Sequence, residues 1–202
     1  MARKKKSKFV GSCGIYLVVE RGDGEILVLV HQRSKQVYES FKIASPGGTV
    51  ERSACMHEQE LDFDKGARTT ALKELYEETG VNYIGHEELL EPLKVGEGAH
   101  WGEEFHRNFA LTVPELVDVP GPEKDSQHEI VKGGMQGVGQ DAEDGYHAWV
   151  PIQDLLHLSS LMESCRTPLL DLLEQRGLCA GDPGEEPPDS PALSVELDQP
   201  PR

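Results

Sequence analysis

Three glutamates, Glu74, Glu77 and Glu78, are spaced so that a helix would bring their side chains together. Their like charges repel by a few tenths of a kcal/mol per pair (about 0.2–0.5), and they lie toward the C-terminal end, where the helix dipole disfavours anions. A divalent cation offsets both effects, and hard oxygen ligands suit Mg²⁺ or Mn²⁺, which can hold a pyrophosphate and activate water. The spacing therefore predicts a metal site. The alternative is a solvated acidic helix face.

A helix over residues 66–80 must position these carboxylates. Its apolar residues, including Ala71, Leu72 and Leu75, form one stripe at about 100° per residue, and the glutamates fall along one edge of that stripe. Gly80 stands where a helix-ending glycine is expected. The carboxylates are therefore expected beside the core-facing side of the helix.

The segments before this helix predict strands. Residues 14–20 and 25–31, joined by a turn at 21–24, have the pattern of a β-hairpin rich in Val, Ile and Leu. Residues 41–51 predict a short strand broken by Pro46, in which Gly47 and Gly48 can bring the backbone close to another group. A plain turn is the alternative there.

The rest of the chain predicts an alternation of strands and helices. Residues 52–65 are polar and acidic and are expected to form a loop or a short extra helix. Further strands are expected at 90–95, 105–113 and 146–150, and further helices at 152–158 and 168–175.

Pro46-Gly47-Gly48 after the hairpin, followed by Lys73-Glu-Leu-Tyr-Glu-Glu-Thr-Gly-Val81, resembles the Nudix box, whose pattern is Gx5Ex7REUxEExGU with U aliphatic. The resemblance extends more weakly to His31-Gln-Arg-Ser34 and Trp149-Val-Pro-Ile152, and it covers residues 12–158. It implies an α/β fold in which helices sandwich a mixed β-sheet in an α/β/α arrangement.

Two departures from the box pattern change what it implies. Lys73 replaces the family's arginine, which keeps a cation but loses the bidentate fork and so loosens orientation. The segment between Gly48 and Lys73 is 11 residues longer than the pattern, which unseats the first glutamate of the box. The residues at the expected positions are Ala54 and Lys65. Substitutes among which the sequence does not choose are Glu58, Glu60 and Asp64.

The resemblance also implies roles for individual residues. Glu77 and Glu78 would be direct metal ligands, the Gly48 carbonyl a backbone ligand, and Glu74 a ligand through water or the general base. Glu74 and the basic Lys73 of the box are the expected catalytic residues.

A later loop offers further site candidates. Glu103 and Glu104 are candidates for an additional metal-binding acid, with Glu104 as our choice, and an exposed loop acid is the alternative. Trp101, beside His100, is expected either to stack on a nucleobase or to pack under the loop.

The implied activity is metal-dependent hydrolysis, with Mg²⁺ or Mn²⁺, of a diphosphate linkage in a nucleoside diphosphate derivative or a related polyphosphate, by water attack on phosphorus. The alternative is a catalytically weakened module that binds a nucleotide or RNA, which Lys73 and the disrupted box favour. The sequence does not specify the base, the leaving group or the oligomeric state, because specificity in such folds lies in loops.

Composition is that of one globular domain. The chain has 202 residues, of which 37% are hydrophobic, and a formal charge of −16, which repels nucleic acid and anionic membranes over most of the surface. No stretch approaches the roughly 18 apolar residues of a membrane helix. The four cysteines form no CxxC pair, which favours the reducing cytosol or nucleus.

The domain is expected over residues 9–178. Residues 1–8 form a basic arm, expected to be flexible, with nuclear import or RNA contact as the alternative. Residues 120–145 are rich in glycine and predict a long surface loop, without the flanking pattern of a phosphate-binding loop. Residues 179–202 are acidic and rich in proline and predict a disordered tail.

Overall fold

The computed structural model describes residues 8–33, 42–57, 60–97, 99, 101–102, 104–117 and 144–178. The chain forms, in order, β1 (Phe9–Glu20), β2 (Ile26–Arg33), β3 (Ile43–Ala44), β4 (Gly47–Glu51), β5 (Met56–His57), β6 (Glu60–Leu61), α1 (Phe63–Thr79), a 3-10 turn η1 (Glu87–Leu89), β7 (Glu91–Leu93), β8 (His106–Thr112), β9 (Asp144–Pro151), α2 (Ile152–His157) and α3 (Glu163–Gln175). No helix in these parts of the chain is long and apolar enough to cross a membrane.

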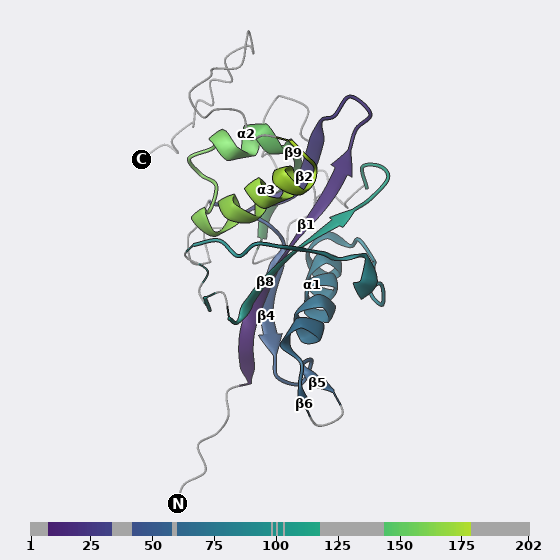
Figure 1. Cartoon of the computed structure of the whole chain (residues 1–202), viewed down its shortest axis with the longest axis vertical. Coiled ribbons are helices and arrows are strands. Elements are labelled where there is room, and N and C mark those ends of the chain that lie inside the picture. The colour runs from purple at the N-terminus through teal and green to yellow at the C-terminus, as the bar shows by residue number, and fades with distance from the viewer. Residues whose placement is uncertain are drawn as a thin grey trace, which may run out of the picture.

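Within the described residues, the main sheet has seven strands and is mixed. Its order is β3-β2-β1-β8-β7, with β4 also paired to β1 and β9 to β2. β1 and β8 run parallel, and the other pairs are antiparallel. Helix α1 covers one face of the sheet, and α2 and α3 cover the other (Figure 1). The predicted α/β/α sandwich around a mixed sheet is therefore confirmed.

The alternation of side chains along β1 builds two cores. Every second residue faces α1, and the residues between them face α2 and α3, because successive side chains of a strand point to opposite faces. A fully buried row on each side makes β1 the centre of the domain. The α1 side holds Ile15, Leu17, Leu72 and Leu75, and the other side holds Tyr16, Val18, Leu169 and Leu172.

One edge of β1 is shared by two strands. β2 pairs with the C-terminal half of β1, and β4 pairs with its N-terminal half. β3, which precedes β4 in the chain, pairs with β2. The chain changes neighbour at Pro46, whose carbonyl accepts the Ile15 N–H at 2.9 Å. Just beyond it, a Cβ on Gly47 would overlap the Cys13 carbonyl oxygen, so this crossing requires glycine. Pro46 and Gly47 therefore mark the point along β1 where its pairing with β2 ends and its pairing with β4 begins.

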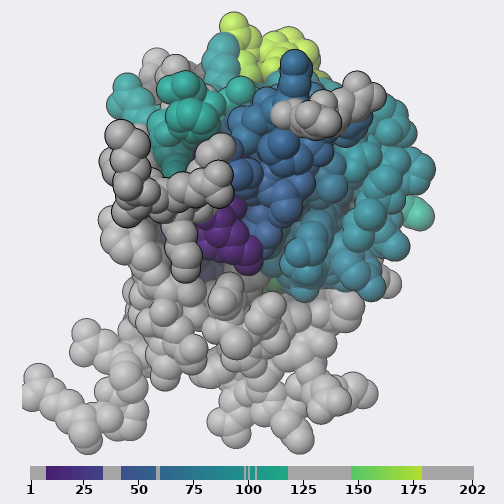
Figure 2. All heavy atoms as spheres, turned by 90° about the horizontal axis from the view of Figure 1, so that it is seen from below, coloured from purple at the N-terminus to yellow at the C-terminus, as the bar shows by residue number. Residues whose placement is uncertain are grey.

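The insertion differs from the prediction of a loop or extra helix. It forms the β5–β6 hairpin, and α1 begins at Phe63, three residues before the expected start. Asp62 caps the helix, because its Oδ1 accepts the Lys65 N–H at 3.0 Å. The Phe63 ring then packs edge-on against Phe105 at 6.0 Å. Figure 2 shows the molecule from the end where this segment lies beside the start of β1.

Helix α3 also begins earlier than predicted. It starts at Glu163 and contains Pro168, which we expected at its first turn. Proline in this place removes the N–H that would bond to the Ser164 carbonyl. The backbone of Gly96 lies directly against that carbonyl, where a Cβ would not fit. The packing of Gly96 against the Ser164 carbonyl therefore accommodates Pro168 inside the helix, although local rules place proline at a helix start.

Smaller differences concern strand limits. The strand expected over 90–95 spans only Glu91–Leu93 and follows a 3-10 turn that the sequence did not predict. β9 begins at Asp144, so the end of the predicted 120–145 loop is strand. The basic arm up to residue 7, most of that loop and the 179–202 tail lie outside the described residues.

Candidate functional site

The last two turns of α1 carry the three glutamates. Leu75 and Thr79 are buried, Glu74 and Glu78 are partly buried, and Glu77 is exposed. Gly80 ends the helix in the left-handed conformation, with φ 75°, and donates its N–H to the Tyr76 carbonyl at 2.8 Å. The last helical residue, Thr79, therefore follows Glu78 directly. Glu74 and Glu78 lie beside the core-facing side of the helix, as predicted, whereas Glu77, expected there too, is exposed.

Glu74 lies against the glycine strand. A Cβ built on Gly48 would overlap the Glu74 carboxylate, whose Oε2 lies 2.8 Å from that position. Any other residue at position 48 would have to displace this carboxylate. The structure thus brings together two residues that the box resemblance pairs, across the insertion that separates them in sequence.

Glu78 is held by two elements. Its Oε1 accepts the Gly47 N–H at 3.3 Å, and its Oε2 lies 3.6 Å from Nδ1 of His31. Only 12% of the side chain is exposed. The carboxylate is therefore fixed beside the start of β4 rather than free in solvent.

Lys73 and Glu77 form an exposed pair on the outer face of α1. Lys73 Nζ lies 3.3 Å from a Glu77 carboxylate oxygen, and the two side chains are 62% and 50% exposed. A pair of this kind contributes about 0.3–0.5 kcal/mol. Lys73 thus keeps a cation beside the carboxylates, with weak orienting force.

Cys13 adds a thiol that the sequence did not indicate. Its Sγ donates to the Gly48 carbonyl at 3.8 Å, because Cys13 and Gly48 are paired in the β1–β4 register. Burial raises the pKa of the Cys13 thiol to about 12, and the negative charges of Glu74 and Glu78 add to the rise, against the lowering effect of the Gly48 bond. The thiol therefore stays protonated and is not a nucleophile at neutral pH.

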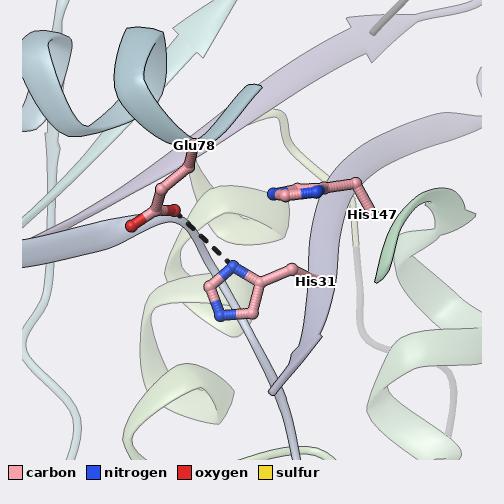
Figure 3. A group of neighbouring side chains, drawn as sticks. All are labelled: His31, Glu78 and His147. Atoms are coloured by element: carbon pink, nitrogen blue, oxygen red, sulfur yellow. Dashed lines mark ion pairs between the residues drawn. The ribbon is translucent and has the colours of Figure 1, made fainter. Parts of the chain in front are cut away.

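Two buried histidines lie beside Glu78. His31 and His147 are directly opposite each other in the β2–β9 register and are 3% and 0% exposed. One ligand atom from each ring and one Glu78 oxygen lie within 4.8 Å of one another (Figure 3). The burial of His31 could have been found from the alternation of side chains along its strand, since His31 follows Leu27 and Leu29 on the face toward α1.

Trp101 and Glu104 lie in the segment that leads into β8. β8 is on the opposite edge of β1 from β4, so β1 separates this segment from the glycine strand. Glu104 is exposed, and its carbonyl accepts a bond from Arg107 Nη1 at 3.4 Å, while Trp101 is partly buried. His100 and Glu103 lie outside the described residues.

Of the substitutes for the displaced box glutamate, Asp64 lies far from the other carboxylates. Asp64 precedes Glu74 by ten helical residues, which is about 15 Å along the axis. Its carboxylate contacts Arg68 at 2.9 Å and Arg107 at 3.4 Å, at the start of α1. Glu60 is exposed on β6, and Glu58 lies outside the described residues.

Comparison with known proteins agrees with this geometry. A family model described as NUDIX domain matches residues 13–172. The fold is similar to that of a NUDIX hydrolase from Alicyclobacillus acidocaldarius, with a TM-score of 0.58 and 16% identity over 88% of this chain and 100% of that one. It is also similar to the NUDIX domain of Shewanella oneidensis NrtR complexed with ADP ribose, with a TM-score of 0.51 and 18% identity over 85% and 90% of the two chains. No curated protein matches the sequence.

Proposed function

Because this chain belongs to the Nudix family of pyrophosphohydrolases, we propose that it uses a divalent cation to hydrolyse a diphosphate linkage in a nucleoside diphosphate derivative or a related polyphosphate. The observation that carries the proposal is the placement of Glu74 against Gly48 and of Glu78 on the Gly47 N–H. These contacts bring the end of α1 and the glycine strand β4, the two halves of the box, together.

The donor set fits Mg²⁺ or Mn²⁺. Carboxylates of Glu74, Glu77 and Glu78 and the carbonyl of Gly48 are hard oxygen donors, which these ions prefer. The glycine leaves no side chain between the strand backbone and the Glu74 carboxylate. When bound, the cation neutralises the diphosphate and lowers the pKa of a coordinated water.

The residues of the chain divide the remaining work. Glu78 is held in place by the Gly47 N–H, whereas Glu77 is exposed and pairs with Lys73, so a rotation of its side chain would have to bring its carboxylate to the cation. Glu74 accepts the proton of the attacking water at a carboxylate oxygen. The water oxygen forms a new bond to phosphorus, the bridging P–O bond breaks, and its electrons leave with the departing phosphate group.

The substrate class rests on a relative as well as on chemistry. The NrtR domain with a similar fold is complexed with ADP ribose, a nucleoside diphosphate derivative. Trp101 is our candidate for stacking on the base, and Glu104 for an additional acid, both from the segment before β8. RNA contact through the basic arm remains a prediction.

A substrate panel tests the proposal. Release of phosphate or nucleotide is measured from nucleoside triphosphates, nucleotide sugars, ADP-ribose, dinucleoside polyphosphates and capped RNA, with Mg²⁺, with Mn²⁺ and with chelator. We expect metal-dependent release that falls at least about 100-fold in Glu78→Gln. The matched control is Glu88→Gln, which removes a 67% exposed glutamate of η1 and keeps activity. Near-normal turnover in folded Glu78→Gln would count against the proposal.

The alternative, a nucleotide-binding module without turnover, is favoured by one observation. Lys73 contacts Glu77 through an exposed ion pair, where the family's arginine offers a fork. Tight nucleotide binding without hydrolysis in the presence of Mn²⁺ would select this alternative. Fast turnover would remove it.

A further inference from the structure

We propose that His31, His147 and Glu78 bind a divalent transition-metal ion, Zn²⁺ or Mn²⁺, through two imidazole nitrogens and one carboxylate oxygen. The site shares Glu78 with the proposed catalytic centre but does not depend on that centre being active. The two imidazoles lie outside the Nudix box. They bring nitrogen donors to a place where the box supplies only oxygen.

The register of the sheet places the two histidines side by side. Residues directly opposite in an antiparallel pair have Cβ atoms about 4.5–5.5 Å apart and point to the same face. For His31 and His147 this is the face that α1 covers, because their strand neighbours Leu29 and Trp149 belong to the same core cluster. The pair therefore sits on rigid strands and needs no loop to form.

The distances are close to those of a coordinated ion. Two ligands about 2.1 Å from one tetrahedral ion are about 3.4 Å apart, and His31 Nδ1 is already 3.6 Å from Glu78 Oε2. All three ligand atoms lie within 4.8 Å of one another, so the widest pair has to close by at most about 1.4 Å to reach that spacing. The two rings meet at 82° with centroids 5.5 Å apart, so they do not stack face to face. Figure 3 shows the side chains converging from β2, β9 and the end of α1.

Burial and ligand type select the kind of ion. Both imidazoles are almost fully buried, and Glu78 is only slightly exposed. Two nitrogens and one oxygen suit zinc, manganese and the other first-row transition metals, whereas Mg²⁺ prefers oxygen ligands and retained water. The Gly47 N–H on the second Glu78 oxygen orients the carboxylate, as outer hydrogen bonds do for metal ligands.

The test titrates the full-length chain with Zn²⁺ alone. Calorimetry gives affinity and stoichiometry, and ¹⁵N spectra of the imidazoles report which rings bind. We expect one ion at this site, shifts of the His31 and His147 nitrogens, and affinity at least about tenfold weaker in His31→Gln and in His147→Gln, since even outer-shell changes cost 10–100-fold. The matched control is His86→Gln, which removes a 58% exposed imidazole and leaves the affinity unchanged.

A second variant keeps the test decisive if a glutamine disturbs the core. His147→Cys retains a ligand for zinc, and with Co²⁺ it must add a thiolate-to-cobalt charge-transfer band. Unchanged Zn²⁺ affinity in folded His147→Gln, or absence of that band in folded His147→Cys, would overturn the proposal. Glu77→Gln separates the two hypotheses: it removes a proposed Mg²⁺ ligand and leaves Zn²⁺ binding intact. Hydrolysis without Zn²⁺ binding defeats only this inference, and Zn²⁺ binding without hydrolysis defeats only the proposed function.

Discussion

Replacing Gly48 by alanine separates the fold of the site from its chemistry. The new Cβ would meet the far end of the Glu74 side chain, because Oε1, Cδ and Oε2 all lie closer to it than the 3.4 Å at which ordinary contacts begin, with Oε1 the nearest. The carboxylate must therefore withdraw by about 1 Å, and a misplacement of that size can cost about 100-fold in rate. We expect kcat/KM with Mg²⁺ to fall by about 100-fold, which corresponds to about 2.7 kcal/mol of transition-state stabilisation.

Stability should respond differently. The displaced group is a flexible carboxylate end, so the free energy of unfolding of Gly48→Ala should stay within about 1 kcal/mol of the parent. Gly47→Ala, by contrast, places its Cβ against the Cys13 backbone carbonyl and should unfold more easily. Gly22→Ala meets no atom within 4 Å and is the neutral control.

Steady-state kinetics and urea unfolding on the three variants check this reasoning. Shortening Glu74 to aspartate relieves the overlap, so Gly48→Ala should cost less in a Glu74→Asp background than in the parent, as a double-mutant cycle measures. A folded Gly48→Ala enzyme with kcat/KM within threefold of the parent would refute the assignment of Glu74 to the reaction.

Three further predictions concern other residues. Lys73→Ala should lower kcat only about three- to tenfold and the free energy of unfolding by less than about 0.5 kcal/mol, because the ion pair between Lys73 and Glu77 is exposed. A 100-fold loss of kcat would mean that Lys73 touches the reacting groups. Burial lowers the pKa of His106 below its ordinary 6.5, so the unfolded chain takes up the proton first and stability falls as pH drops below about 6.5. The urea midpoint should therefore be lower at pH 5.5 than at pH 7.5, and His106→Asn should reduce this difference. Arg176→Lys loses the two-pronged contact to Glu91, at 2.7 and 3.1 Å, and should cost about 1 kcal/mol in urea unfolding, with no change contradicting it.

Local pattern predicted the elements that carry the box. The β1–β2 hairpin, α1 and the order of later strands follow from side-chain periods of two and 3.6, which each segment contains within itself. The start of α1 was missed because Asp62 belongs to an acidic run, in which a cap looks like any other carboxylate. Pro168 misplaced α3 for a related reason, since only the packing of Gly96 against the helix shows that the proline is tolerated.

The sequence by itself determined the helix that presents Glu74 and Glu78 at its edge and the glycines able to approach it, because spacing along one chain sets the face of a helix. Only the tertiary structure decided that Gly48 meets Glu74 across the insertion, and that His31 meets His147. These contacts depend on strand register, and register is fixed by packing between segments that lie far apart in the chain, which no local pattern records.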